Sequence, residues 1–164
     1  MSYRDASPSP VNGLLASMAR VDRGHVTGAC ERIDLTYGDE ICRSGDRIRH
    51  VYFPTDSYIS MIVPAGASEN LEVGLVGNEG MFGLPLVLGV DVSPVRAVVQ
   101  GAGSALRIGG PLFMRELGRS QALQRAIDRY IFVHLSQVAQ TAACMRFHVV
   151  EARLARWLLM TQDR

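Results

Sequence analysis

Gly38-Asp39-Glu40-Ile41-Cys42-Arg43-Ser44-Gly45-Asp46 contains two glycine-aspartate pairs that lie seven residues apart. Glycine tolerates the positive φ of a tight turn, and aspartate stabilises turns through its short side chain. Each pair therefore predicts a corner between two strands. Because the two corners are so close in sequence, we expect them to be successive corners of one coiled β ribbon.

The chain around this stretch, from residue 30 to residue 108, has the pattern of a β domain. Short runs rich in β-branched and aromatic residues alternate with Gly, Pro, Asp and Asn, as in strands joined by tight turns. Turn residues also occur at 54–56 and 64–68. Such closely spaced strands are typical of a sandwich, a barrel or a jelly roll. We predict seven strands, at residues 32–35, 40–43, 49–53, 58–63, 71–76, 95–100 and 104–108.

Helices are predicted on both sides of the β domain and once inside it. Residues 12–18 can form a short amphipathic helix, and the glycine-rich segment 77–86 is expected to be a turn that leads into another. Gly110-Pro111 begins a helix over 112–117, which Gly118 is expected to end. A longer helix then runs from about Ser120 to Met145.

The long helix carries two apolar stripes. The first follows the 4-3 spacing of a coiled-coil seam, and we assign a homodimer interface to it: Leu123, Ile127, Tyr130, His134, Gln137 and Thr141. The second stripe consists of Phe132, Leu135, Ala139 and Ala142. One stripe can cover the β domain while the other meets a second copy. Burial of both stripes within one monomer is the alternative.

Composition limits the class of protein. With 164 residues, 48% of them apolar and 20% charged, the chain is expected to be globular. It has no apolar run near the roughly 20 residues that span a bilayer, so no membrane contact is expected. The polar first ten residues do not suit a signal peptide, and three scattered cysteines suit a reduced compartment, so we expect a cytoplasmic protein. Residues 111–164 hold eight arginines against four acidic residues, which hints at an anionic partner.

A β-roll with this corner repeat, a glycine-rich insertion and a seam-bearing helix together resemble the sensor part of the cyclic-AMP receptor/FNR (Crp/Fnr) superfamily of bacterial transcription regulators. The resemblance covers about residues 12 to 164 and implies an α+β, mainly β chain. Its fold would be a double-stranded β-helix, or jelly roll, followed by a long dimerisation helix. Four stretches in order carry it: His50-Val51-Tyr52-Phe53-Pro54, Gly77-Asn78-Glu79-Gly80-Met81-Phe82-Gly83, Arg96-Ala97-Val98-Val99-Gln100 and Glu151-Ala152-Arg153-Leu154-Ala155-Arg156-Trp157-Leu158-Leu159.

The resemblance also implies a domain plan. Residues 1–118 would be an effector-sensing domain with a short N-terminal helix, 119–147 the dimerisation helix and hinge, and 148–164 the first helix of a winged helix-turn-helix domain. We place the hinge at 144–148. The recognition helix of such a domain is expected only in a longer protein, so the chain would be the sensing and dimerising part of a DNA-binding regulator working by allostery. A ligand-binding module that never had a DNA-binding domain is the alternative.

The family's cyclic-nucleotide cassette can be compared with this sequence residue by residue. It uses a Gly-Glu pair, in which Glu holds the ribose hydroxyl, and an Arg about ten residues later for the phosphate. Here Gly83 and Leu84 occupy the pair, and the Arg position falls at Val95 or Arg96. Because leucine cannot accept a hydrogen bond, a ribose hydroxyl buried there would lose about 1–3 kcal/mol. Cyclic AMP is therefore not expected.

The sequence does not identify a cofactor, and it is compatible with a small-molecule effector. The effector-pocket candidates that follow from the resemblance and from the long helix are Gly77, Glu79, Gly83, Leu84, Arg96, Tyr130 and His134.

Metal binding and catalysis are the remaining alternatives. Cys144 and His148 lie one helical turn apart and could share a metal, but two ligands do not make a site, so no metal site is assigned. His134 could bind haem or sense pH, although a hydrogen-bonded seam histidine is more common. A cupin-like jelly-roll enzyme would need a His-x-His pair, and His50 stands alone on its strand. We therefore assign no catalytic residue.

Overall fold

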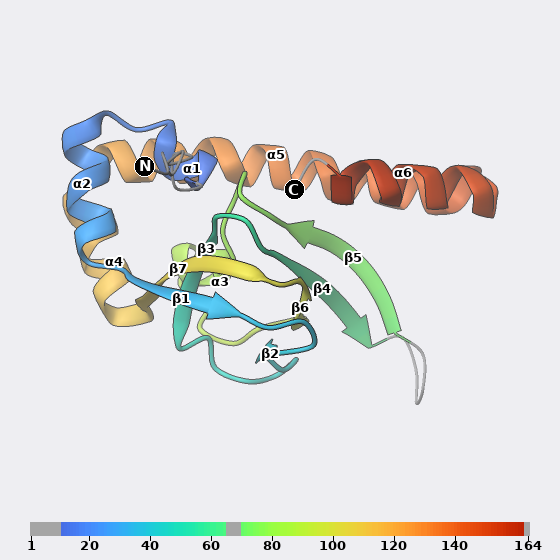
Figure 1. Cartoon of the computed structure of the whole chain (residues 1–164), viewed down its shortest axis with the longest axis horizontal. Coiled ribbons are helices and arrows are strands. Elements are labelled where there is room, and N and C mark those ends of the chain that lie inside the picture. Colours follow the sequence, from blue (N-terminus) through green and yellow to red (C-terminus); the bar gives the residue numbers. More distant parts are fainter. Residues whose placement is uncertain (1–10, 65–69, 163–164) are drawn as a thin grey trace, which may run out of the picture.

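The β domain of the computed structural model is a roll of two antiparallel sheets that enclose one hydrophobic core (Figure 1). The structure describes residues 11–64 and 70–162, so the turn predicted at 64–68 lies outside it from residue 65 onward. One sheet has the strand order β1-β7-β3 and the other β2-β6-β4-β5. All seven predicted strands are present: β1 (Glu31–Leu35), β2 (Glu40–Cys42), β3 (His50–Pro54), β4 (Tyr58–Pro64), β5 (Asn70–Val76), β6 (Arg96–Gly101) and β7 (Gly103–Gly109). The predicted β-roll is thus confirmed.

The two glycine-aspartate corners have the geometry that the sequence predicts. Gly38 and Gly45 both have a φ of 87°, a left-handed conformation that residues with a side chain rarely adopt. Their N–H groups donate to backbone oxygens in or just before β6, from Gly38 to Val99 (2.9 Å) and from Gly45 to Ser93 (2.8 Å). The two corners therefore attach successive turns of the ribbon to the same neighbouring segment.

The helices differ from the prediction mainly at their ends. The element α2, which lies between α1 and β1, was not predicted because only Val26 of its nine residues is buried. Gly118 does not end α4, since a single glycine costs a helix only about 1 kcal/mol. The break comes at Ser120, which is extended and whose hydroxyl caps the next helix by accepting from the Leu123 N–H at 3.1 Å. The helices are α1 (Gly13–Ala16), α2 (Arg20–Gly28), α3 (Leu84–Val87), α4 (Gly110–Arg119), α5 (Gln121–Phe147) and α6 (Val150–Gln162).

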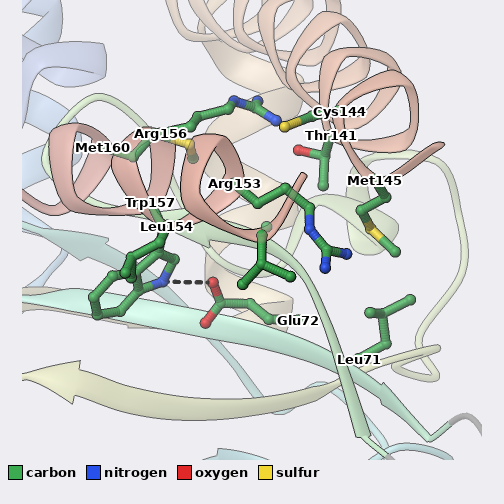
Figure 2. A pocket seen from close by; sticks show the side chains of 12 residues that line it. Leu71, Glu72, Thr141, Cys144, Met145, Arg153, Leu154, Arg156, Trp157 and Met160 are labelled. Carbon is green, nitrogen blue, oxygen red and sulfur yellow. Dashed lines mark hydrogen bonds between the residues drawn. The ribbon is translucent and has the colours of Figure 1, made fainter. Parts of the chain in front are cut away.

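The last helix, α6, lies against β5 and the C-terminal part of α5 (Figures 1 and 2). Trp157 projects toward β5, where its Nε1–H donates to Glu72 Oε1 at 3.0 Å. The break between α5 and α6 begins at His148, whose backbone is extended. Cys144 is still helical, so the break between the helices lies at the C-terminal end of the predicted hinge segment 144–148. Within the described ranges, no helix has both the length and the apolar composition needed to cross a bilayer.

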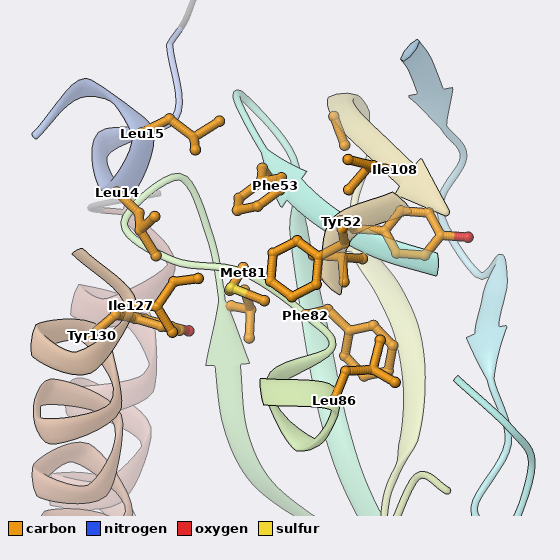
Figure 3. Packing of buried hydrophobic residues seen from close by; sticks show 14 of the residues in the cluster. Leu14, Leu15, Tyr52, Phe53, Met81, Phe82, Leu86, Ile108, Ile127 and Tyr130 are labelled. Atoms are coloured by element: carbon orange, nitrogen blue, oxygen red, sulfur yellow. The ribbon is translucent and has the colours of Figure 1, made fainter. Parts of the chain in front are cut away.

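The N-terminal half of α5 belongs to the core of the monomer (Figure 3). Leu123 and Ile127 have no exposed surface and Tyr130 has 4%, and Figure 3 shows Ile127 and Tyr130 beside Leu14 and Met81. The assignment of Leu123, Ile127 and Tyr130 to a dimer interface is therefore wrong. The physical reason is that the roll and α1 leave an apolar face open, and this stripe of α5 covers it.

The second stripe has the opposite environment. Phe132 is 73% exposed and Leu135 62%, and Ala139 and Ala142 are exposed as well. The two predicted stripes thus have different environments, and the stripe predicted to form the homodimer interface is the one that packs on the roll.

Two polar groups connect distant segments of the roll. The buried Asn12 side chain caps α1 by accepting from the Leu15 N–H, and it donates to the carbonyls of Pro54 (2.9 Å) and Gly80 (2.8 Å). Asp56 Oδ1 accepts from the Ser104 N–H at 2.6 Å and from its hydroxyl at 2.7 Å. The hydrogen bonds from Ser104 lower the pKa of the Asp56 carboxyl, because they favour its ionised form.

Candidate effector site

A cavity of about 490 Å³ lies between the roll and α5. Its walls come from β4 and β5, from the segment that follows β5, from the residues around α3, from the segment before β6, and from one face of α5. Gly83 and Leu84 line it, as the cassette comparison predicts, and so does His134 on α5. Apolar side chains make up most of the rest: Met61, Val73, Met81, Phe82, Pro85, Leu88, Val90, Val92, Pro94, Val95, Ile131, Leu135 and Val138.

The loop that leads into the cavity is held from two sides. Phe82 exchanges two backbone hydrogen bonds with Tyr52 of β3, at 2.9 and 3.1 Å. Tyr130 packs so closely on Gly80 that a Cβ built there would lie 2.1 Å from the Tyr130 ring. Gly80 is therefore required by close approach, and Tyr130 acts as a support for the loop, outside the residues that line the cavity.

His134 is the candidate whose environment is most unusual. Its Nδ1 is buried and has no hydrogen-bond partner among the described residues. The ring lies 5.9 Å from the Tyr130 ring, measured between centroids. Burial lowers the pKa of His134, and the nearby Glu79 carboxylate offsets part of this shift. Burial thus favours the neutral form of the imidazole.

Arg96 lies outside the cavity, which corrects its assignment as an effector contact. Successive residues of a strand face opposite sides, so in β6 the buried Ala97 and Val99 face the core while Arg96 faces outward. Its Nε donates to Glu40 Oε1 at 2.6 Å. The pKa of Glu40 is lowered most by the hydrogen bond from Arg43 and next by the hydrogen bond from Arg96. The residue of the cassette's Arg position that does line the cavity is Val95.

The remaining candidates lie near the cavity but do not line it. Gly77 and Glu79 stand at the start of the glycine-rich loop, where the Gly77 N–H donates to Glu79 Oε1 at 3.3 Å.

Gln137 and Thr141, from the predicted dimer seam, are half-buried on α5. Thr141 belongs instead to a second groove.

That second groove, of about 400 Å³, lies between β5, the end of α5 and α6 (Figure 2). Leu71, Thr141 and Leu154 represent its three walls. At its α5 side the Cys144 Sγ lies 3.3 Å from Nδ1 of His148, so the two residues considered as metal ligands are in contact. In the part of the chain that the structure describes, no three side chains of His, Cys, Asp or Glu are placed to hold a metal ion.

Known structures share this architecture, although no family model and no curated relative matches the sequence. The c-di-GMP-responsive global regulator CLP of Xanthomonas campestris aligns over 85% of this chain and 70% of its own, with 18% identity and a TM-score of 0.70. The Thermus thermophilus catabolite activator protein aligns over 82% of this chain and 63% of its own, with 14% identity and a TM-score of 0.66. This chain has the fold of a Crp/Fnr-type sensor domain.

The likeness extends to sensor domains that were solved alone. The sensor domain of the transcriptional regulator DNR from Pseudomonas aeruginosa aligns over 78% of this chain and 86% of its own, with 12% identity and a TM-score of 0.59. At such low identities the comparison establishes the sensor-domain fold and leaves the ligand open.

Sequence reasoning missed the greater part of the cavity wall. Val73, Ile131 and Val138 carry no motif, and an apolar residue in a strand or helix gives the same signal whether it faces a core or a cavity. The 3.6-residue period of α5 could have placed Ile131, Leu135 and Val138 on the His134 side of the helix, because these residues are three and four apart.

Proposed function

We propose that this chain is the effector-sensing and dimerising part of a bacterial transcription regulator of the Crp/Fnr type. The observation that carries the proposal is the course of α5. Ile131, His134 and Val138 of this helix line the cavity, and Thr141 and Cys144 of the same helix line the groove against α6. One continuous helix thus joins the candidate effector site to the element that would begin a DNA-binding domain.

The coupling works through differential affinity. A ligand in the cavity contacts α5 and the α3 segment together, so it favours whichever α5 position fits both walls. The end of α5 and α6 share a groove, so a shift of α5 changes how α6 packs on β5. A ligand with no preference between two such positions would change nothing downstream.

Dimerisation is assigned here to the second stripe of α5, with Phe132, Leu135, Ala139 and Ala142 at its centre. These residues recur at three- and four-residue spacing along one exposed face, as in helices that pair. Phe132 is a large exposed apolar side chain. Its burial against a partner would favour association by about 25 cal/mol per Å² of apolar surface removed from water.

The test is sedimentation equilibrium at tens of micromolar protein. We expect the wild-type chain to be a dimer and Phe132→Asp to be a monomer with an unchanged circular dichroism spectrum, because the new charge would face the partner and not the core. Val21→Asp, on the equally exposed surface of α2, is the matched control and should stay dimeric. A monomeric wild-type chain, or a dimeric Phe132→Asp variant, would contradict the proposed interface.

For DNA, we expect the 164 residues alone to bind duplex weakly, without sequence preference and with a steep loss of affinity as salt rises. Sequence-selective binding by this chain at physiological salt would overturn the proposed division between sensing and reading parts. Filter-binding titrations against a library of defined duplex sequences and against random-sequence duplex, at several salt concentrations, measure the affinity and the sequence preference.

A further inference from the structure

The chemistry of the cavity selects against charged ligands. None of its lining side chains is charged, and only Ser93 and His134 are polar. The Ser93 hydroxyl is already used within its own segment, since its Oγ donates to the Val95 carbonyl at 2.7 Å. An ionised ligand group placed here would lose its hydration without gaining a partner, which is strongly unfavourable.

The two anchors of a cyclic nucleotide are replaced by apolar side chains. Leu84 stands where a carboxylate would hold the ribose, and Val95 faces the cavity where a guanidinium would hold the phosphate. The neighbouring Arg96 is engaged by Glu40 on the outer face of the sheet. The wall that would bind a nucleotide is thus apolar in both places.

One hydrogen-bonding position remains. His134 lines the cavity, and its Nδ1 is buried without a partner among residues 11–64 and 70–162. A buried polar atom without a partner is uncommon in folded proteins and costs about 1–3 kcal/mol. Because neighbouring protein atoms shield Nδ1 from solvent, a ligand in the cavity reaches it through a rotation of the imidazole ring. The rim is apolar too, with Leu88 and Val90 largely exposed beside Leu135 on α5.

We infer that the cavity binds an uncharged, mainly apolar small molecule with a single hydrogen-bonding group, such as a hydroxyl or a ring N–H, which pairs with His134. This inference rests on the proposed sensing function and names the ligand class of that site. The volume of about 490 Å³ lies within the usual range of small-molecule sites.

The first test uses N-phenyl-1-naphthylamine, an uncharged apolar probe that becomes fluorescent out of water. We expect saturable binding to the wild-type chain. Leu84→Glu places a carboxylate in the wall and should weaken binding at least tenfold, and Leu84→Trp, which fills the cavity with apolar bulk, should weaken it similarly. Val21→Glu adds the same charge on exposed α2 and should bind as the wild type does. Circular dichroism verifies the fold of each variant.

The second test concerns the hydrogen bond. Two competitors of the probe are compared, 1-naphthol and naphthalene, which differ by one hydroxyl group. We expect wild-type protein to prefer 1-naphthol by roughly 2- to 10-fold, the range of one net hydrogen bond. His134→Leu should lose this preference while still binding naphthalene. A preference that survives in His134→Leu would overturn the assigned role of His134.

Two further outcomes separate the inference from the proposed function. Absence of saturable probe binding, together with calorimetric binding of cyclic AMP or cyclic GMP, would overturn the inference and leave the sensing function standing. Trp157 is the sole tryptophan, so its emission reports the α6 groove. Binding of 1-naphthol that leaves Trp157 emission unchanged would support the ligand class and count against the coupling to α6.

Discussion

Truncating Ile127 and truncating Phe132 are expected to have different consequences, although the two residues lie on the same helix. Ile127 has no exposed surface within one chain, whereas Phe132 is 73% exposed. Ile127→Ala removes three carbons from a packed core and leaves a cavity, so we expect it to lower the free energy of unfolding by about 2–5 kcal/mol. Phe132→Ala should change the stability of a monomer by no more than about 0.5 kcal/mol.

Urea unfolding, followed by far-ultraviolet circular dichroism at several protein concentrations, distinguishes the two effects. A chain that dimerises through Phe132 has an unfolding midpoint that rises with protein concentration, because association stabilises only the folded state. Phe132→Ala should flatten this dependence. Ile127→Ala should lower the midpoint at every concentration, by roughly 1 M or more at the usual urea sensitivity of small domains.

Two results would refute this reasoning. If Ile127→Ala costs less than about 0.5 kcal/mol, the residue does not lie in a packed monomer core. If Phe132→Ala lowers the midpoint equally at all concentrations, Phe132 stabilises the monomer, and the second stripe of α5 is not the interface.

Three further predictions concern contacts that hold the roll and its helices. Gly80→Ala forces the Tyr130 ring out of a position 2.1 Å from the new Cβ, so we expect a loss of roughly 1–3 kcal/mol in urea unfolding. In the Gly80→Ala background, the further substitution Tyr130→Ala should lower the free energy of unfolding by less than it does in the wild-type chain, because the clashing ring is gone. If the two substitutions have additive effects, the clash is not the cause. The lowered pKa of Asp56 means that its contribution to stability is present above its ordinary pKa of 3.8 and is lost as the pH falls through the folded value. Asp56→Asn should therefore make the urea midpoint less dependent on pH in the acid range, and an unchanged slope would remove Asp56 as a source of acid sensitivity. Glu72→Ala removes the acceptor of the Trp157 indole N–H, so tryptophan emission should shift to the red and proteolysis within α6 should increase. Unchanged emission would show that other contacts hold α6.

The sequence alone determined the roll and the order of its elements. Two glycine-aspartate pairs fix two corners because few other residues adopt a φ of 87°. Turn residues between short β-branched runs then place all seven strands. The prediction that cyclic AMP is not bound rests on Leu84 and needs no structure, since no arrangement of neighbours lets a leucine side chain accept a hydrogen bond from a ribose.

The orientation of single residues came only from the tertiary structure. The sequence leaves the cassette's Arg position at residue 95 or 96, depending on how the loop before β6 is aligned. A shift of one residue in a strand reverses the side on which a side chain lies. The register of β6 turned Arg96 outward to Glu40 and left Val95 facing the cavity.

The partners of α5 were likewise beyond the sequence. Helical periodicity shows that a helix has two apolar stripes, but it says nothing about which stripe meets the roll, because that depends on surfaces contributed by residues far away in the chain. Ile127 is buried because Leu14, Met81 and the rest of the core lie opposite it, whereas Phe132 on the other stripe remains exposed. Long-range packing, which brings the N-terminal helix and the glycine-rich loop under α5, made that choice and left a cavity beside His134.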